Sequence, residues 1–303
     1  PFIDAPAGVD FTVGIAPANS SSSADAIATF DYNLTANETY IIVASGIVNA
    51  AGYNPAPAFN LEVFAGAREV SSTNGNTDVL VYHGSTDAPA VDVVETLVTG
   101  GATIVDNAFY SDFAGYLELA TLDYRLAVKD ATGSVTVKTY EAPLETLGLQ
   151  NLALTVLASG FLDPSQNSNG APFGLFVALP SGGALIPLPE STARVQVIHN
   201  SPDALATAVD VYLNDALLID DFAFRTASPF IDAPAGIDFT VGIAPANSSS
   251  SADAIATFDY NLAANETYII VASGIVNAAG YNPAPAFNLE VFAGAREAAS
   301  TQG

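Results

Sequence analysis

Short apolar runs separated by turn residues dominate the hydrophobic pattern of this chain. The runs are rich in Val, Ile, Leu, Phe and Tyr, and Gly, Pro, Asn and Ser lie between them. A long amphipathic helical pattern is not evident. We therefore predict strands over residues 79–82, 152–157, 239–243 and 268–272.

Two of the apolar patterns predict where a strand lies in its sheet. Residues 134–140 alternate, with Val135, Val137 and Thr139 on one face and Thr136, Lys138 and Tyr140 on the other, which predicts a strand with one solvent-facing side. Residues 268–272 are apolar on both faces, which predicts a central strand covered front and back.

The chain repeats itself at two levels. Residues 1–75 recur as residues 229–303, an offset of 228 (229 minus 1), with five substitutions. Halving that offset shows an older repeat, in which residues 79–89 match residues 195–205. The five substitutions are Val9/Ile237, Thr35/Ala263, Val70/Ala298, Ser71/Ala299 and Asn74/Gln302.

These repeats predict three parts along the chain. Residues 1–75, the opening segment, are the C-terminal two-thirds of a B-type domain. Residues 76–191, module A, are a complete A-type domain, and residues 192–303, module B, are a complete B-type domain. The opening segment lacks the counterpart of residues 192–228. We expect upstream sequence of the same polypeptide to supply it, and the alternative is a second chain that lends the strands.

The strand spacing predicts the fold class. About seven or eight short strands in each module, without cysteine, are typical of a Greek-key, immunoglobulin-like β-sandwich. Small β-barrels are the alternative.

Composition narrows the classes of partner. The chain carries 32 acidic and seven basic residues, a formal charge of −25, and the carboxylates are scattered. Such a surface repels nucleic acid and anionic lipid, because both need Lys or Arg to displace counterions. The longest apolar runs fall short of the roughly 18 residues that a spanning helix needs, so we expect no membrane insertion of this segment.

The two histidines occupy matched positions in modules A and B. Each is followed by Ser and Asp at steps of two, a composition that suggests a catalytic triad. Triad members converge from separate segments, however, and neighbours on one turn cannot easily do so. We interpret both groups as structural, with Ser and Asp bonding local backbone and His fixing a strand end, and we predict no catalytic residues. The groups are His83, Ser85 and Asp87, and His199, Ser201 and Asp203.

Oxygen-rich positions give the candidates for a metal. Asp163, Asn167 and Asn169 lie in one loop, and Ca²⁺ takes six to eight oxygens, but the spacing matches no known calcium loop. We expect no other cofactor. Carboxylates also recur at matched places, Asp92 with Asp210 and Asp106 with Asp220.

The pattern Val-x-Val-x-His-x-Ser-x-Asp-Ala, followed by Val91-Asp-Val and Val209-Asp-Val, resembles the opening of the secreted bacterial domains called domain of unknown function 4397. Leu205 departs from the pattern, since module A has Pro89 there. The resemblance implies export and a tandem arrangement, and it implies no activity or catalytic residues.

Three features together favour a non-catalytic structural protein: repetition, missing catalytic groups, and short linkers at residues 72–77 and 188–192. The prediction is an extracellular filament or cell-surface stalk that self-associates from alternating A and B domains. The alternative is a surface adhesin whose loop tips bind glycan, protein or mineral, with or without calcium.

Overall fold

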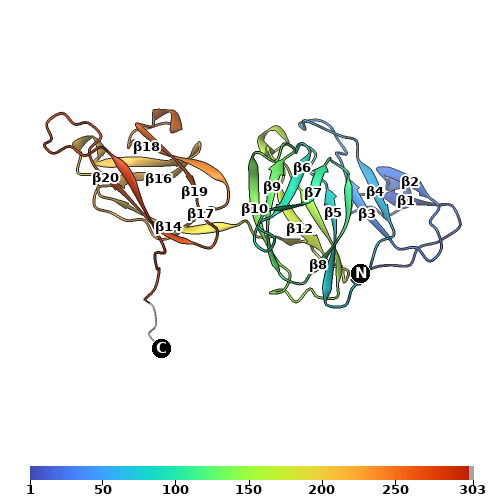
Figure 1. Cartoon of the computed structure of the whole chain (residues 1–303). Helices are drawn as coiled ribbons and strands as arrows, with labels where there is room; N and C mark the ends of the chain where they lie inside the picture. Colours follow the sequence, from blue (N-terminus) through green and yellow to red (C-terminus); the bar gives the residue numbers. More distant parts are fainter. Residues whose placement is uncertain (300–303) are drawn as a thin grey trace. The chain divides into compact units, whose positions relative to one another are not determined.

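The computed structural model describes residues 1–299 and divides into two compact units. The first comprises residues 1–134 and 141–189, and the second comprises residues 135–140 and the chain from residue 190 onward. Strands dominate both units (Figure 1). The predicted all-β sandwich class is confirmed, and the described sheets do not close into a barrel. Within residues 1–299, no helix is long and apolar enough to cross a bilayer.

Module A is built from two sheets. Their strand orders are β10-β9-β6-β7 and β13-β12-β11-β5-β8. Val93 and Val128 from the first sheet and Leu154 and Val156 from the second are buried. The strands are β5 (Asn76–His83), β6 (Val91–Glu95), β7 (Ala102–Ala108), β8 (Phe113–Ala120), β9 (Asp123–Asp130), β10 (Thr136–Pro143), β11 (Ala153–Ser159), β12 (Gly174–Ala178) and β13 (Ile186–Pro187), with a short 3-10 turn η2 (Pro164–Gln166).

Module B has two four-stranded sheets, ordered β17-β14-β20-β21 and β16-β15-β18-β19. Its core takes Val195 and Ile270 from the first sheet and Val211 and Phe239 from the second. β20 is central in its sheet, between β14 and β21, as predicted for residues 268–272. It is not covered on both faces, because Tyr268 and Ile270 are buried whereas Ile269 and Val271 are only half-buried. The elements are β14 (Thr192–His199), η3 (Ala204–Ala206), β15 (Ala208–Leu213), β16 (Ala216–Ala223), β17 (Ile231–Pro234), β18 (Asp238–Pro245), η4 (Ser251–Asp253), β19 (Ala256–Asn261), β20 (Thr267–Ser273) and β21 (Asn288–Ala293).

Each module contains one parallel strand pair within an otherwise antiparallel arrangement. β5 pairs parallel with β11, and β14 pairs parallel with β20. The first strand of each module therefore lies inside its sheet, with a strand on either side.

The prediction of one wet face for residues 134–140 is wrong. Val135 is 58% exposed, whereas the neighbouring Thr139 and Tyr140 on β10 are both buried. Tyr140 lies on the face expected to meet water, with Thr136 and Lys138, yet it is 1% exposed. Thr139 lies on the opposite face and donates its hydroxyl to the carbonyl of Ala235, so protein covers both faces at this end of β10.

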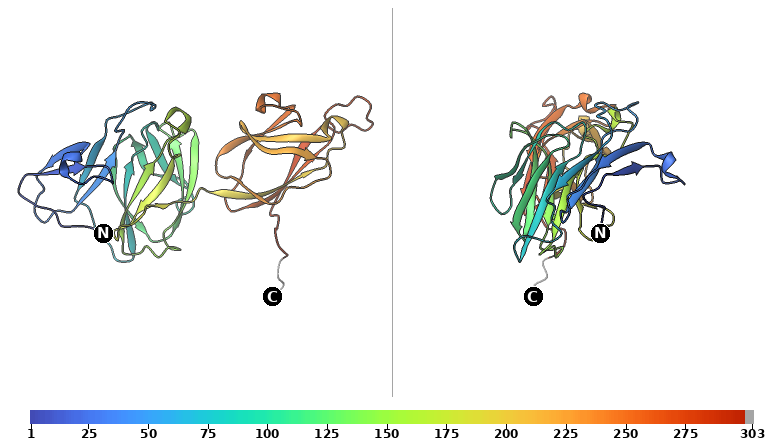
Figure 2. Two further views of the ribbon diagram at one scale, coloured as in Figure 1. Left: turned by 180° about the vertical axis from the view of Figure 1, so that it is seen from behind. Right: turned by 90° about the vertical axis from the view of Figure 1, so that its right-hand side faces the viewer.

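The opening segment forms two separate ribbons (Figure 2). β1 (Phe11–Ile15) pairs with β2 (Ala28–Tyr32), β3 (Tyr40–Ser45) pairs with β4 (Asn60–Ala65), and η1 (Ser23–Asp25) precedes β2. Their counterparts β18 and β20 in module B each pair on both edges. The open edges leave Ile42 42% exposed, whereas its counterpart Ile270 is 5% exposed.

Candidate functional site

The His-Ser-Asp group of module A joins two loops by hydrogen bonds, with His83 and Ser85 buried and Asp87 half-buried. His83 Nε2 lies 3.2 Å from the carbonyl oxygen of Pro89, and the Ser85 hydroxyl donates to the carbonyl of Gly160 at 2.7 Å. Asp87 accepts hydrogen bonds from the backbone amides of residues 162 and 163. The group thereby connects the end of β5 to the loop that follows β11.

Module B repeats this arrangement. His199 Nε2 lies 2.7 Å from the Ala206 carbonyl, and the Ser201 hydroxyl donates to the carbonyl of Gly274 at 2.7 Å. Asp203 accepts from the amides of Val276 and Asn277 and so ties the loop after β20.

The chemistry of these groups differs from that of an acyl-transfer triad. A nucleophilic serine needs its hydroxyl hydrogen-bonded to the imidazole that will take the proton. Here both serine hydroxyls donate to backbone carbonyls. Burial lowers the pKa of both His83 and His199, which favours neutral imidazoles. The structural role of the six residues remains a prediction that this geometry supports.

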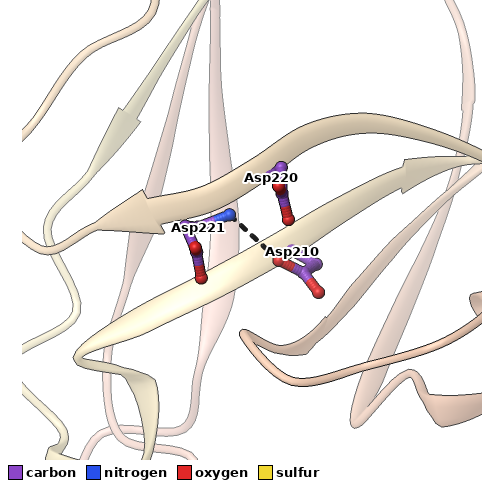
Figure 3. A group of neighbouring side chains, drawn as sticks. All are labelled: Asp210, Asp220 and Asp221. Atoms are coloured by element: carbon purple, nitrogen blue, oxygen red, sulfur yellow. Dashed lines mark hydrogen bonds between the residues drawn. The ribbon is translucent and has the colours of Figure 1, made fainter.

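A cluster of three carboxylates lies on the β15–β16 pair of module B (Figure 3). Asp210 is buried, and Asp220 and Asp221 are exposed. Asp210 accepts from the Asp221 amide at 3.0 Å and from the Ser248 hydroxyl. Burial acts to raise the pKa of Asp210, but these donors outweigh burial, so the pKa lies below its ordinary value.

Module A has the same hydrogen bond from a backbone amide to a buried aspartate, but without the carboxylate cluster. Asp92 accepts from the Asn107 amide at 2.8 Å, and Asn107 and Asp221 both have left-handed φ values, 49° and 51°. The β6–β7 and β15–β16 pairs both shift register here. The buried aspartate therefore satisfies the amide of a β-bulge, which explains the recurrence of Asp92 and Asp210 without a metal.

The calcium candidates lie in the loop around η2. Asp163 accepts from the Ser165 amide and hydroxyl, and so caps the turn. Asn167 is fully buried, and its side chain donates to Asp87 at 3.1 Å and accepts from the Asn54 amide at 3.0 Å. Asn169 is exposed. Protein donors thus already use oxygens that calcium would need at Asp163 and Asn167, and calcium binding here stays a prediction.

Module A also contains an internal cavity of about 210 Å³, against about 50 Å³ in the core of module B. Its lining is largely apolar, with Val93, Leu117 and Val156 among the residues. Glu95 and the Nε2 atom of His83 already hydrogen-bond to backbone groups, whereas His83 Nδ1 and the Tyr82 hydroxyl have no hydrogen-bond partner among the described residues. The cavity therefore offers few polar groups to fix a ligand.

The most specific contacts outside the cores join the opening segment to module A. We call this surface the junction. Arg68 Nη1 lies 2.6 Å from Asp78 on β5 and 2.8 Å from Glu118 on β8. Asp78 and Glu118 are directly paired across the two strands, where like charges repel. One arginine from the opening segment bridges both carboxylates and lessens their repulsion, and its guanidinium also stacks 4.5 Å from the centroid of the Tyr116 ring.

Aromatic packing continues the junction along β4 and β8. The Phe64 ring centroid lies 5.3 Å from that of Phe113 and 5.8 Å from that of Tyr116. The Tyr116 hydroxyl accepts from the Arg68 amide at 2.8 Å. Aromatic pairs of this kind stabilise a contact by about 0.5–1.5 kcal/mol beyond the area they bury.

A second contact lies at the loop before β4. The Tyr53 ring centroid is 5.7 Å from that of Phe161, and the Ser168 hydroxyl donates to the Gly52 carbonyl at 3.0 Å. On β3, the hydroxyls of Ser45 and Tyr110 lie 3.0 Å apart. Ionic, aromatic and hydrogen-bonding contacts thus combine at the junction.

The outer face of β5 shows that module A is buried at this surface. Asp78, Leu80 and Tyr82 are at most 1% exposed, and burial raises the pKa of Tyr82 to about 12. The matched residues of module B, at positions 194, 196 and 198, are only partly buried. Sequence reasoning missed the junction, although the reversal from Asp78 to Arg194 at matched repeat positions was a visible signal.

The comparisons with known proteins agree with the resemblance noted in the sequence. Residues 193–293, within module B, match the family described as Domain of unknown function (DUF4397). The chain matches no curated protein.

Solved structures resemble the chain only distantly. A family 26 carbohydrate-binding module of Eubacterium rectale Amy13K, in complex with maltoheptaose, is 11% identical and has a TM-score of 0.21, covering 73% of this chain and 98% of that one. A proposed cell adhesion protein from Bacteroides eggerthii is 11% identical at a TM-score of 0.19, covering 75% and 97%. One from Bacteroides ovatus is 8% identical at 0.19, covering 72% and 97%. Scores this low carry no argument about function.

Proposed function

We propose that this chain is a non-catalytic structural protein of the cell exterior, in which B-type and A-type modules alternate along a filament or cell-surface stalk. The junction carries the proposal. The opening segment is B-type in sequence, and it contacts module A through an ion pair to the buried Asp78 and through packed aromatic rings. A contact of this kind between unlike modules is what a linear array requires.

The strands β1 and β3 of the opening segment each have one edge without a described partner strand. β1 and β3 each have one partner strand, whereas β18 and β20 have two. Unpaired strand edges recruit further strands. Sequence equivalent to residues 192–228, from the same or another polypeptide, would supply the counterparts of β14, β15 and β16.

Two further observations support an exported, non-catalytic role. The serines of both His-Ser-Asp groups donate to backbone carbonyls and are not aimed at an imidazole. Scattered carboxylates and the family resemblance suit an extracellular protein, and the same charge disfavours nucleic acid as a partner.

Immunogold electron microscopy of source cells tests the proposal. Antibody against the full chain should label threads or stalks outside the cell, at regular intervals along them. Label confined to the cell interior would refute it.

An adhesin is the competing proposal, and a glycan and surface binding screen with the full chain separates the two. A structural protein should bind none of the ligands specifically, with and without added Ca²⁺. Saturable binding to one glycan class would favour the adhesin instead.

A further inference from the structure

We propose that the outer face of β21 in module B, with Phe292 and Arg296, is a docking surface for an A-type module that follows module B in the same polypeptide. The inference deepens the proposed function, because it names the partner and the residues of the second contact in a repeating array. It rests on a comparison between two nearly identical surfaces of this chain.

The two surfaces share one sequence but differ in what covers them. Residues 60–69 and residues 288–297 are identical. Phe64 is partly buried against Phe113 and Tyr116, whereas Phe292 is 61% exposed. An exposed phenylalanine on a strand whose copy is packed marks a contact surface that lacks its partner here.

The charges differ in the same way. Arg68 bridges Asp78 and Glu118 of module A. Its counterpart Arg296 is exposed and pairs with no carboxylate among residues 1–299. In a chain with so few cations, an exposed arginine beside an exposed phenylalanine suits a partner that offers two carboxylates and two aromatic rings.

Closure of the module B sandwich leaves this surface free. Leu289 points into the core, and Phe292 lies on the opposite face of β21 because side chains alternate along a strand. The opening segment uses the same outer face, through Phe64 and Ser45, to contact module A. Docking and completion of the sandwich therefore do not compete.

The charges at one pair of facing positions, which differ between modules A and B, favour an A-type partner. Module A presents Asp78 opposite Glu118, two carboxylates that need a cation from outside the module. Module B has Arg194 opposite Asp232, and Arg194 already pairs with Asp232 and Glu297. A B-type module in that place would bring Arg194 towards Arg296, which disfavours B-to-B contact.

The sequence also supplies the connection. Gly303 aligns with Gly75, which is followed at once by Asn76 of module A. A second copy of residues 76–191 fused directly after Gly303 therefore reproduces the register of the junction.

The absence of tryptophan from the chain makes a direct test simple. Phe292→Trp places a single indole on the proposed surface, and Phe64→Trp places one in the existing junction as a matched reference. Emission is measured for each variant in the 303-residue chain, and for Phe292→Trp also in the chain extended by the second copy of residues 76–191. Phe64→Trp in the extended chain verifies that the extension leaves the first junction intact.

We expect Phe292→Trp to emit as an exposed indole in the 303-residue chain and to shift to the wavelength of the Phe64→Trp reference in the extended chain. Adding Arg296→Glu should lower the docking equilibrium constant by about tenfold or more, because a third carboxylate would face Asp78 and Glu118 of the appended module. Emission should then return towards the exposed value.

An unchanged exposed emission of Phe292→Trp in the extended chain, with the reference intact, would overturn the inference. A blue shift in the unextended chain that grows with protein concentration would also overturn it, because the occupant would then be a second copy. Failure to find extracellular threads would refute the proposed function without affecting this result, so the two can fail separately.

Discussion

Replacing Arg68 by alanine should weaken the contact between the opening segment and module A. The change removes the only described cation within ion-pair distance of Asp78, whose side chain is fully buried, and it removes the guanidinium stacked on Tyr116. Breaking a fully buried ion pair by deleting one partner costs about 3–5 kcal/mol. The Arg68 side chain is 34% exposed, so solvent screening reduces that cost, and we expect about 2 kcal/mol.

Native-state hydrogen exchange is the suitable assay, because it resolves local opening of β4 and β8 from unfolding of the second unit. Arg296→Ala is the matched control, since the same residue in the same local sequence has no described carboxylate partner. It should change protection by less than about 0.5 kcal/mol.

A second variant tests the mechanism. Asp78→Asn should recover part of the loss in the Arg68→Ala background, because a neutral amide no longer needs a cation. Equal effects of Arg68→Ala and Arg296→Ala, or no recovery with Asp78→Asn, would refute the reasoning.

The Glu95 carboxylate accepts from the amides of residues 97–99; burial opposes its ionisation, but these donors lower its pKa from 4.5 to about 2. Because the pKa is depressed in the folded state, the stabilisation that the ionised Glu95 carboxylate gives is complete above about pH 4.5 and is lost as pH falls towards 2. Glu95→Gln should therefore lower the free energy of unfolding, measured in urea, by about 3 kcal/mol at pH 7 and by little at pH 2. Fusing residues 192–228 directly before Pro1 should slow hydrogen exchange in β1 and β3, and an equally long Gly/Ser extension should not; equal exchange in both would contradict the strand assignment. Asp210→Asn should lower stability at pH 7 by about 1–2 kcal/mol, because the Asp221 amide loses a charged acceptor, and the loss should be as large in EDTA as in Ca²⁺; a loss seen only with Ca²⁺ would indicate a metal site.

Local sequence pattern was sufficient for the strands that it was used to predict, but it did not assign those strands to sheets. Runs such as residues 239–243 and 268–272 carry their own β signal, and the repeat placed equivalent strands at equivalent positions. The parallel pairing of β5 with β11 was not predictable, because it joins residues more than 70 positions apart and leaves no local signature. The two-sided burial at Thr139 and Tyr140 depends on covering residues such as Ala235, which alternation within residues 134–140 cannot show.

The site was less predictable than the fold. The His-Ser-Asp groups and the matched Asp92 and Asp210 could be found by comparing the two halves of the repeat. The junction could not be found in this way, because it depends on which residue forms an ion pair with Asp78. The change of charge from Asp78 to Arg194 at matched positions indicated that the two modules differ there. Only the folded chain shows that Arg68 is the residue that forms the ion pair with Asp78.

Cryo-electron microscopy of the assembly isolated from its source tests the central claim most directly. The account predicts a continuous thread of alternating A- and B-type sandwiches, in which the strand equivalent to β4 lies against the β8 strand of the next A-type module at every B-to-A step. Separate particles, or a thread in which the phenylalanine and arginine of this strand face solvent, would contradict it.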